Sequence, residues 1–268
     1  NKSIAHRIRI ICGDVTESQC GLSDEKYNEL AKRTTHVVHS AATVQFNLSL
    51  DVTRAINVGG TKQVMSFAKR VQESGSLNRV AHISTAYVSG NRSGVIYEDM
   101  DHSATAFSNS YEHAKYEAEQ YVRGLMKELP IMIFRPSIIV GDSATGATTA
   151  FNVLYGPLKL ISRGLLRYVP GSSSTPLDVV PVDYVADAMY HIFFESNEQT
   201  GKTYHLTAGK ENVSTAGEIV KLAVKYFDGD AAGRKTRRIR FLPLSFCNAA
   251  KRFLRSELKK LLEMMKPF

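Results

Sequence analysis

Long apolar runs and cysteines are both scarce in this chain. No stretch of about 18 apolar residues occurs among its 268 residues, so the sequence predicts no membrane-spanning helix. The first residues also lack the apolar segment of a signal peptide. Three cysteines, Cys12, Cys20 and Cys247, form no CxxC pair and are too few for a disulfide framework. These absences predict a cytoplasmic protein in a reducing compartment.

A surplus of basic charge is absent from most of the chain, although the whole chain has a formal net charge of +8. Residues 229–268 hold eleven lysines and arginines against three acidic residues, which accounts for the entire surplus. Residues 1–228 are therefore neutral. This balance argues against a basic main body that binds nucleic acid, and we expect no nucleic-acid partner.

Strand-like and helix-like segments alternate through the neutral part of the chain. The expected strands are residues 7–12, 35–42, 79–85, 131–135 and 202–206, and the expected helices are residues 23–32, 51–71, 110–127, 184–194 and 214–227. Ser23 is the expected N-cap of the first helix. The alternation predicts an α/β fold with a doubly wound parallel sheet covered by helices on both faces.

Residues 141–181 interrupt this alternation and are too apolar for a solvated loop. Their apolar residues include Phe151, Val153, Leu154, Leu158, Leu160, Ile161, Leu165, Leu166 and Tyr168. We expect helical pieces that line an elongated apolar cleft for a substrate. The chain then divides into a core at 1–140, a substrate-binding region at 141–228 interleaved with the last core elements, and a basic tail at 229–268.

The tail predicts a basic amphipathic helix. Apolar residues recur near helical spacing from Phe246 to Met265, and the lysines and arginines lie largely elsewhere around the helix. Such a helix can lie on an anionic membrane surface or bind a partner. It can equally fold back over the substrate cleft, and both interpretations stay open.

Tyr111 and Lys115 are the first candidates for chemistry. They lie four residues apart in an expected helix, so both side chains project from one face. The lysine ammonium would then lower the pKa of the phenol and make it a usable proton donor or acceptor. A second pair with this spacing, Tyr155 and Lys159, is set aside because Gly156-Pro157 should prevent a continuous helical turn.

Small and hydroxylated residues follow three of the expected strands. Ser84 and Thr85 end one strand, Ala41-Ala42 end another, and Arg135-Pro136-Ser137-Ile138 ends a third. The carboxyl ends of parallel strands meet at one edge, where α/β sheets bind ligands. A hydroxyl there can hold a substrate oxygen beside a catalytic phenol, whereas the small residues permit close approach by a flat ligand.

Two other features are interpreted as structural. Cys12 lies within the first expected strand with no general base nearby, so we expect it to pack in the core. His36 and His39 are separated by an odd number of positions on a strand, face opposite sides and make a poor metal pair. We therefore expect no metal site.

Together these residues resemble a known family. The motifs are Gly13-Asp14-Val15-Thr16, His39-Ser40-Ala41-Ala42-Thr43-Val44, Asn57-Val58-Gly59-Gly60-Thr61, His82-Ile83-Ser84-Thr85-Ala86-Tyr87-Val88, Tyr111 with Lys115, Arg135-Pro136-Ser137-Ile138-Ile139-Val140-Gly141 and Leu177-Asp178-Val179-Val180-Pro181-Val182-Asp183-Tyr184-Val185-Ala186. Their order and spacing over residues 7–210 resemble the Rossmann-type extended short-chain dehydrogenase/reductases. The resemblance is strongest to the fatty acyl-CoA reductase and thioester reductase branch, with its male sterility-type NAD-binding domain. That family opens with a strand and a glycine-rich turn, and no such turn precedes Arg7, so we expect its first βα units to be absent from this chain.

The resemblance implies that Thr85, Tyr111 and Lys115 are the catalytic residues. It also implies that NADPH is the cofactor, bound by Tyr111, Lys115 and a further set of residues. Of this set, Asp14 and Val15 would flank the adenine, and Ala41, Ala42 and Thr43 would lie beside the ribose and pyrophosphate. The remaining two, Pro136 and Ile138, would lie against the nicotinamide. Asn57 is interpreted as structural, tying its helix to neighbouring backbone.

The implied activity is the NADPH-dependent reduction of a fatty acyl thioester to an aldehyde, and in a second step to an alcohol. The thioester partner is a long-chain acyl-CoA or an acyl carrier protein, and the tail would add contact with a membrane surface. Two alternatives stay open. One is an extended reductase or epimerase that acts on a nucleotide sugar or small ketone, and the other is a non-catalytic nucleotide-binding module.

Overall fold

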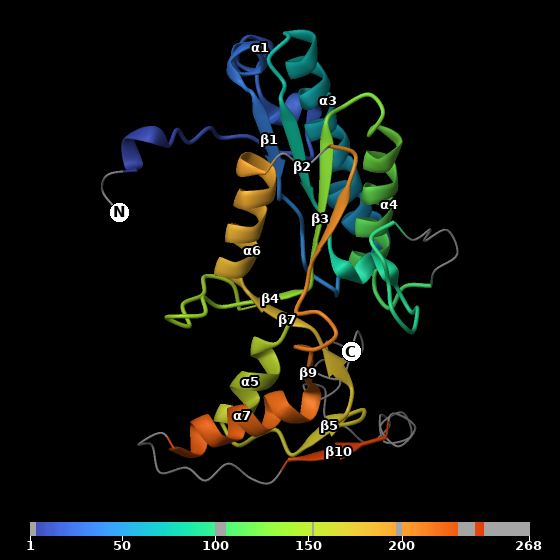
Figure 1. The fold of residues 1–268 in the computed structure, drawn as a ribbon, viewed down its shortest axis with the longest axis vertical. Coiled ribbons are helices and arrows are strands. Elements are labelled where there is room, and N and C mark those ends of the chain that lie inside the picture. Colours follow the sequence, from blue (N-terminus) through green and yellow to red (C-terminus); the bar gives the residue numbers. More distant parts are fainter. Residues whose placement is uncertain (1–3, 100–105, 152, 197–199, 230–238, 244–268) are drawn as a thin grey trace. The chain divides into compact units, whose positions relative to one another are not determined.

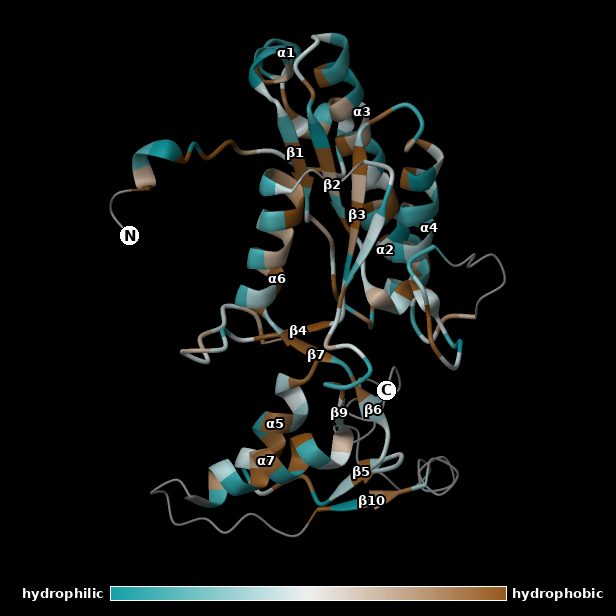
Figure 2. Ribbon diagram, viewed as in Figure 1, coloured by the Kyte–Doolittle hydropathy of each residue, from teal (hydrophilic) through white to brown (hydrophobic). Residues whose placement is uncertain are grey.

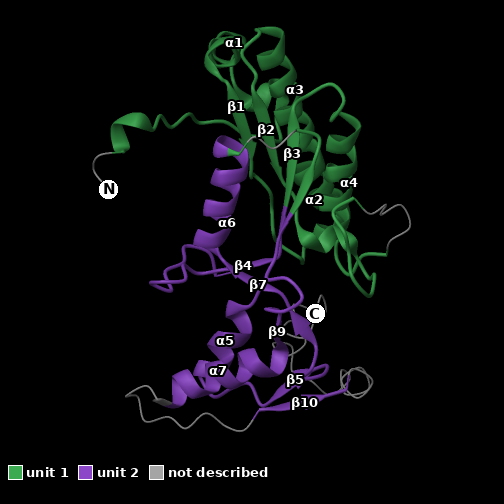
Figure 3. Ribbon diagram, viewed as in Figure 1, with its two compact units in different colours: residues 1–134, 196–204 green, residues 135–195, 205–268 purple. Residues whose placement is uncertain are grey.

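The computed structural model describes residues 4–99, 106–151, 153–196, 200–229 and 239–243 (Figure 1). The chain forms two compact units, one from residues 1–134 and 196–204 and the other from residues 135–195 and 205–268 (Figure 3). Each unit has a hydrophobic core of its own.

A four-stranded sheet in the order β1-β2-β3-β8 forms the centre of the first unit. β1 (His36–His39), β2 (Arg79–Ile83) and β3 (Ile131–Pro136) pair in parallel, with Val37 opposite Val80 and Val80 opposite Ile131. β8 (Thr203–Leu206) completes the sheet. Parallel neighbours joined through helices are the arrangement expected for this alternating sequence, so the predicted α/β class is confirmed.

Helix caps in the first unit lie where polar side chains can accept the first free N–H groups. α1 (Asp24–Arg33) begins at the predicted N-cap, where the Ser23 hydroxyl accepts the Lys26 N–H. α4 (Ser110–Gly124) is capped in the same way by Asn109. The long helix expected at 51–71 is three consecutive helical segments: α2 (Leu50–Arg54), the π-helical turn η3 (Ala55–Gly59) and α3 (Gly60–Glu73). The glycine pair therefore lies at a wide turn within the helix, and the helix continues through it.

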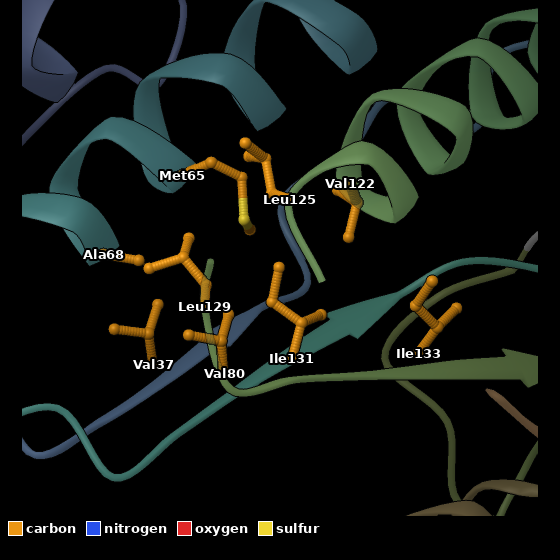
Figure 4. Packing of buried hydrophobic residues seen from close by; sticks show 9 residues of the cluster. All are labelled: Val37, Met65, Ala68, Val80, Val122, Leu125, Leu129, Ile131 and Ile133. Atoms are coloured by element: carbon orange, nitrogen blue, oxygen red, sulfur yellow. The ribbon is translucent and has the colours of Figure 1, made fainter. Parts of the chain in front are cut away.

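The core of the first unit lies between the sheet and the helices α3 and α4. Figure 4 shows strand residues such as Val80 and Ile131 directed toward Met65 of α3 and Val122 of α4. The buried cluster consists of Val37, Met65, Ala68, Val80, Val122, Leu125, Leu129, Ile131 and Ile133. Burial of each large aliphatic side chain contributes about 1.5–3 kcal/mol, so this cluster fixes both helices on the sheet.

The strand predicted at residues 7–12 is wrong. Residues 8–12 follow a single 3₁₀ turn (Ala5–Arg7) and pair with no described strand, and Ile8 and Ile10 are 65% and 89% exposed. β-Branched residues favour a strand only where a neighbouring strand completes the hydrogen bonds. Within the described sheet β1 pairs only with β2, so residues 7–12 pair with no strand there. The prediction that Cys12 packs in the core fails for the same reason, because Cys12 is exposed.

In its described residues, the second unit consists of short strand pairs and three helices. β4 (Ile138–Val140) pairs in parallel with β7 (Val179–Pro181), and β5 (Tyr168–Pro170) pairs in parallel with β10 (Arg240–Leu242). β6 (Pro176–Leu177) and β9 (Ser214–Thr215) are antiparallel. The helices are α5 (Tyr155–Ser162), α6 (Val182–Tyr190), which the π-turn η5 (His191–Glu195) extends, and α7 (Ala216–Gly229).

The predicted break between Tyr155 and Lys159 is also wrong. Both residues lie in α5, and Gly156-Pro157 occupy its first turn. The first N–H groups of a helix have no intrahelical acceptor, so a proline there removes no hydrogen bond and its fixed φ suits the helix. Figure 2 shows that α5 and part of α7 are strongly apolar, as expected for elements that share a core.

The helix predicted from Phe246 to Met265 lies outside the described residues. In the part of the chain that the structure describes, no helix has both the length and the apolar character needed to cross a membrane.

Two histidines are buried side by side in the first unit. His39 of β1 is opposite His82 of β2, and their ring centroids are 5.5 Å apart. The His39 Nε2 lies 2.9 Å from the Thr61 hydroxyl, whereas neither ring nitrogen of His82 has a hydrogen-bond partner among the described residues. Burial, with a smaller contribution from the Lys115 charge, lowers the pKa of His39 to about 4 and the pKa of His82 well below its usual value.

The lowered pKa values of these two histidines predict that the folded protein becomes less stable in acid. Below about pH 6.5 the unfolded chain binds protons at these histidines and the native chain does not, so the free energy of unfolding should fall as pH drops from 6.5 toward 4. The expected slope is about 1.4 kcal/mol per pH unit for each histidine. Urea unfolding of the wild type and His82→Leu between pH 7.5 and 4.5 measures this slope, which the substitution should reduce.

His191→Gln is the matched control, because His191 is exposed. Its unfolding should keep the wild-type pH dependence. An unchanged slope in His82→Leu would show that burial of this ring does not set the acid stability.

Candidate active site

The residues that follow β2 form one wall of the candidate site. β2 ends at Ile83, and Thr85 caps the 3₁₀ turn η4 (Ala86–Ser89) by accepting the Tyr87 N–H with its hydroxyl. The Ser84 N–H donates to the Phe134 carbonyl of β3 at 2.7 Å. Ser84 and Thr85 are both buried. The strand end is therefore fixed by backbone and side-chain hydrogen bonds on both sides.

The start of α4 places Tyr111 and Lys115 beside this strand end. The Asn109 side chain accepts the Glu112 N–H at 2.9 Å, and the Glu112 carboxylate in turn accepts the Asn109 side-chain amide at 2.8 Å. This reciprocal capping fixes the first turn, which contains Tyr111. The Thr85 hydroxyl hydrogen-bonds the Tyr111 phenol, and the Phe46 ring meets the Tyr111 ring edge-on at 5.5 Å.

Lys115 extends to the same strand end from one turn further along α4. Its ammonium donates to the Ile83 carbonyl at 2.6 Å, and the residue is 4% exposed. The structure thus brings together all three side chains predicted to be catalytic: Thr85 and Tyr111 through their hydroxyls, and Lys115 through the residue two positions before Thr85.

The acid–base properties of this cluster differ from the sequence-based expectation. Burial raises the pKa of Tyr111 to about 12, with a smaller rise from the Glu112 charge, and the Thr85 hydrogen bond opposes both. Burial lowers the pKa of Lys115 to about 8, and the Glu119 charge opposes that shift. The expected lowering of the phenol pKa is therefore wrong here, because burial of the phenol dominates its pKa. The phenol is held in its protonated, proton-donating form.

The segment after β1 forms a second wall. Ala41 and Ala42 are exposed, and Thr43 is half-buried. Asn57, in the π-turn η3, accepts the Thr43 N–H at 2.8 Å and donates to the Thr43 carbonyl at 3.1 Å. The structural interpretation of Asn57 is confirmed, because its side chain holds this backbone in place and leaves the two alanines accessible.

Asp14 and Val15 lie in a tight loop next to the start of α3. The Asp14 carboxylate accepts the backbone N–H and the hydroxyl of Thr16, and these hydrogen bonds lower its pKa. A Cβ on Gly60 would lie 3.1 Å from a Val15 methyl carbon, so glycine at this position lets the loop pack on the helix. Gly60 within the long helix therefore has a packing role that the sequence alone did not suggest.

Pro136 is the last residue of β3 and Ile138 is the first residue of β4, and both belong to the second unit. The Ile138 N–H donates to the Asp178 carbonyl at 3.2 Å, where β4 begins its pairing with β7. Ile138 also lines an apolar pocket within this unit.

That pocket has an empty volume of about 750 Å³, which includes its opening to solvent. Its lining is Ile138, Val153, Leu154, Pro157, Leu158, Ile161, Leu166, Val169, Pro170, Ser172, Thr175, Leu177, Ala216, Ile219 and Val220. Five of the apolar residues singled out in the segment 141–181 line it, as predicted, whereas Phe151, Leu165 and Tyr168 are exposed. The contribution of α7 was missed because the sequence does not indicate which face of that helix meets α5.

The chain is similar in sequence to a known family and to several curated proteins. Residues 1–189 match the family model of the male sterility protein. The fatty acyl-CoA reductase wat of Drosophila melanogaster is 28% identical over 240 residues, which cover 78% of this chain and 46% of that protein. L-2-aminoadipate reductase of Saccharomyces cerevisiae is 30% identical over 199 residues, which cover 69% of this chain and 14% of that protein. The chain thus spans less than half the length of these curated relatives.

Solved structures share the fold. The terminal R domain from the myxalamid PKS-NRPS biosynthetic pathway superimposes with a TM-score of 0.79 at 28% identity, covering 100% of this chain and 66% of that one. RMD from Pseudomonas aeruginosa, solved with NADPH, has a TM-score of 0.64 at 18% identity, covering 91% of this chain and 82% of that one, a likeness of fold alone. With the family model matching well over half of its length, the chain belongs to the male sterility protein family, in the fatty acyl-CoA and thioester reductase branch of the Rossmann-type, NAD(P)-binding extended short-chain dehydrogenase/reductases.

Proposed function

We propose that this chain carries the catalytic site of an NADPH-dependent reductase that converts a long-chain acyl-CoA into an aldehyde. The observation that carries the proposal is the cluster of Thr85, Tyr111 and Lys115 at the end of β2. Reduction of the aldehyde to an alcohol would use the same three side chains in a second cycle. The relatives, which include a fatty acyl-CoA reductase and an aminoadipate reductase, support a reductase of carboxyl derivatives.

The residues around the cluster suit a nicotinamide dinucleotide. Ala41 and Ala42 are exposed, follow the end of β1 and have only a methyl group as side chain. The flat parts of a nucleotide can therefore approach the backbone there. Asp14 and Val15 would flank the adenine, Thr43 would lie beside the pyrophosphate, and Pro136 and Ile138 would lie against the nicotinamide. The cofactor, when bound, supplies a hydride to the substrate carbonyl.

The protein side of the chemistry is proton donation and orientation. Thr85 and Tyr111 would hydrogen-bond the substrate carbonyl oxygen and stabilise the negative charge that develops on it. Tyr111 would then donate its proton to that oxygen, a role that suits a phenol held protonated by burial. The resulting hemithioacetal would collapse by cleavage of its C–S bond, with the hydroxyl proton passing to sulfur, so that the CoA thiol leaves and the aldehyde remains. Lys115, buried one helical turn along α4 from Tyr111, would hydrogen-bond the cofactor ribose and add positive charge to the site.

The apolar pocket of the second unit supports a fatty acyl substrate. Its lining is almost entirely aliphatic, and Ser172 and Thr175 are its polar members. A nucleotide sugar needs many hydrogen-bond partners, so this lining favours an acyl chain over the alternative sugar substrate. The R-domain neighbour, which comes from a PKS-NRPS pathway, makes a carrier-protein thioester the second candidate donor.

Replacement of the phenol hydroxyl tests the catalytic assignment. In the full-length protein, Tyr111→Phe should lower kcat by about two to four orders of magnitude, because the proton donor is lost. NADPH should still bind within a few-fold of its wild-type affinity. The rate of NADPH oxidation with palmitoyl-CoA and calorimetric titration with NADPH measure the two quantities.

Tyr121→Phe on the same helix is the control, because Tyr121 packs against the core cluster away from the strand end. It should keep wild-type turnover. Comparable turnover in Tyr111→Phe would exclude Tyr111 as the proton donor.

Acyl chain length tests the pocket. Burial of each methylene contributes about 0.8 kcal/mol, so KM should fall about fourfold per added methylene until the pocket is filled. Val220→Phe, which adds a ring to the lining, should raise KM for palmitoyl-CoA at least tenfold and leave octanoyl-CoA within about twofold. Steady-state kinetics across a series of acyl-CoA lengths measures both effects.

Leu222→Phe is the matched control on α7, since Leu222 is 66% exposed. It should reproduce the wild-type dependence on chain length. If Val220→Phe and Leu222→Phe behave alike at every length, the pocket does not hold the acyl chain.

A further inference from the structure

Three consecutive residues at the end of β2 are each held by a different side chain of α4. The Ile83 carbonyl accepts the Lys115 ammonium at 2.6 Å, and the Thr85 hydroxyl hydrogen-bonds Tyr111. Between them, the Ser84 hydroxyl donates to the Glu119 carboxylate at 2.6 Å. Tyr111, Lys115 and Glu119 are spaced four residues apart, so they project from one face of the helix.

Glu119 is held in place from both sides by hydrogen bonds. It is fully buried, and its second carboxylate oxygen accepts the Arg123 Nε–H at 2.8 Å. Arg123 in turn donates to the Thr203 hydroxyl of β8 at 2.8 Å. A buried carboxylate costs several kcal/mol unless it is paired and hydrogen-bonded, and here the guanidinium and the serine hydroxyl satisfy it. Through Ser84 and Arg123, the carboxylate thus links α4 to the end of β2 and to β8.

We propose that Glu119 is a positioning residue for the reductase site: it fixes Ser84 between the two residues that Lys115 and Tyr111 contact, and it supplies the negative charge that balances the Lys115 ammonium. The role of Glu119 in catalysis rests on the proposed reductase function. Its effect on the protonation of Lys115 is independent of that function. Glu119 contacts neither substrate nor cofactor in this scheme.

The electrostatics around Lys115 agree with this role. Burial lowers the pKa of Lys115 to about 8, and the Glu119 charge is what opposes the shift. The other titratable groups near the ammonium are Tyr111 on the same helix and His39 and His82 on β1 and β2. Burial keeps both imidazoles and the phenol neutral at pH 7. Without the carboxylate, the ammonium would lose its proton more readily.

Two substitutions separate the charge of Glu119 from its hydrogen bond to Ser84. Glu119→Gln keeps the shape and removes the charge, so Lys115 should titrate at a pH at least about one unit lower than in the wild type. Ser84→Ala keeps the charge and removes the bond to the strand end, so the Lys115 titration should stay within about half a unit of the wild type. Both should lower kcat at least tenfold, and in Glu119→Gln the alkaline limb of kcat/KM should move to lower pH.

The Lys115 titration is read in the full chain by NMR of lysine labelled with ¹³C at Cε, with Lys115→Arg to assign the signal. Glu117→Gln is the matched control, because Glu117 lies on the same helix, is partly exposed and pairs with Arg54. It should change neither the titration nor kcat. Circular dichroism and Tm establish that each variant is folded.

An unchanged Lys115 titration in folded Glu119→Gln would overturn the charge role, and an unchanged kcat in Ser84→Ala would overturn the positioning role. If Glu119→Gln does not fold, Ser84→Ala still decides the proposal through kcat. Absence of acyl-CoA reduction in the wild type would defeat the proposed function, whereas the lysine titration would still test the link between Glu119 and Lys115.

Discussion

The hydrogen bond from the Lys115 ammonium to the Ile83 carbonyl joins α4 to the end of β2, and the candidate site is built around that junction. A buried ammonium needs acceptors, because its transfer from water to an apolar interior is costly. The strand end supplies one in Ile83, and α4 supplies a compensating charge in Glu119. The same junction brings Tyr111 to Thr85, so one helix-to-strand contact sets the geometry of all three candidate catalytic side chains.

Burial has opposite effects on the two ionisable residues of the cluster. It raises the pKa of the Tyr111 phenol to about 12 and lowers that of the Lys115 ammonium to about 8, because an apolar surrounding disfavours the charged form of each. The two histidines beneath them are neutral for the same reason. Around neutral pH the region therefore contains a neutral phenol, neutral imidazoles and an ammonium that Glu119 balances.

The second unit is organised around an apolar pocket. α5 and α7 pack against each other through aliphatic side chains such as Ile161 and Val220, and both also line the pocket. Most of its lining comes from the segment between β4 and β7, which contributes no strand to the sheet of the first unit. The proposal therefore assigns the chemistry to one unit and acyl-chain recognition to the other.

The sequence by itself determined the parallel α/β class, the helix start at Ser23 and the helical pairing of Tyr111 with Lys115, because these depend on periodicity and spacing of four residues or fewer. It also identified most of the apolar segment that lines the pocket. Tertiary structure decided the rest. Residues 7–12 form no strand because strand formation needs a paired neighbour, and the Tyr111 pKa is raised because the packing of α4 on the sheet buries the phenol. Glu119 was missed because a carboxylate at helical spacing is common on exposed faces, and only the packing of α4 on the sheet buries this one against Ser84 and Arg123.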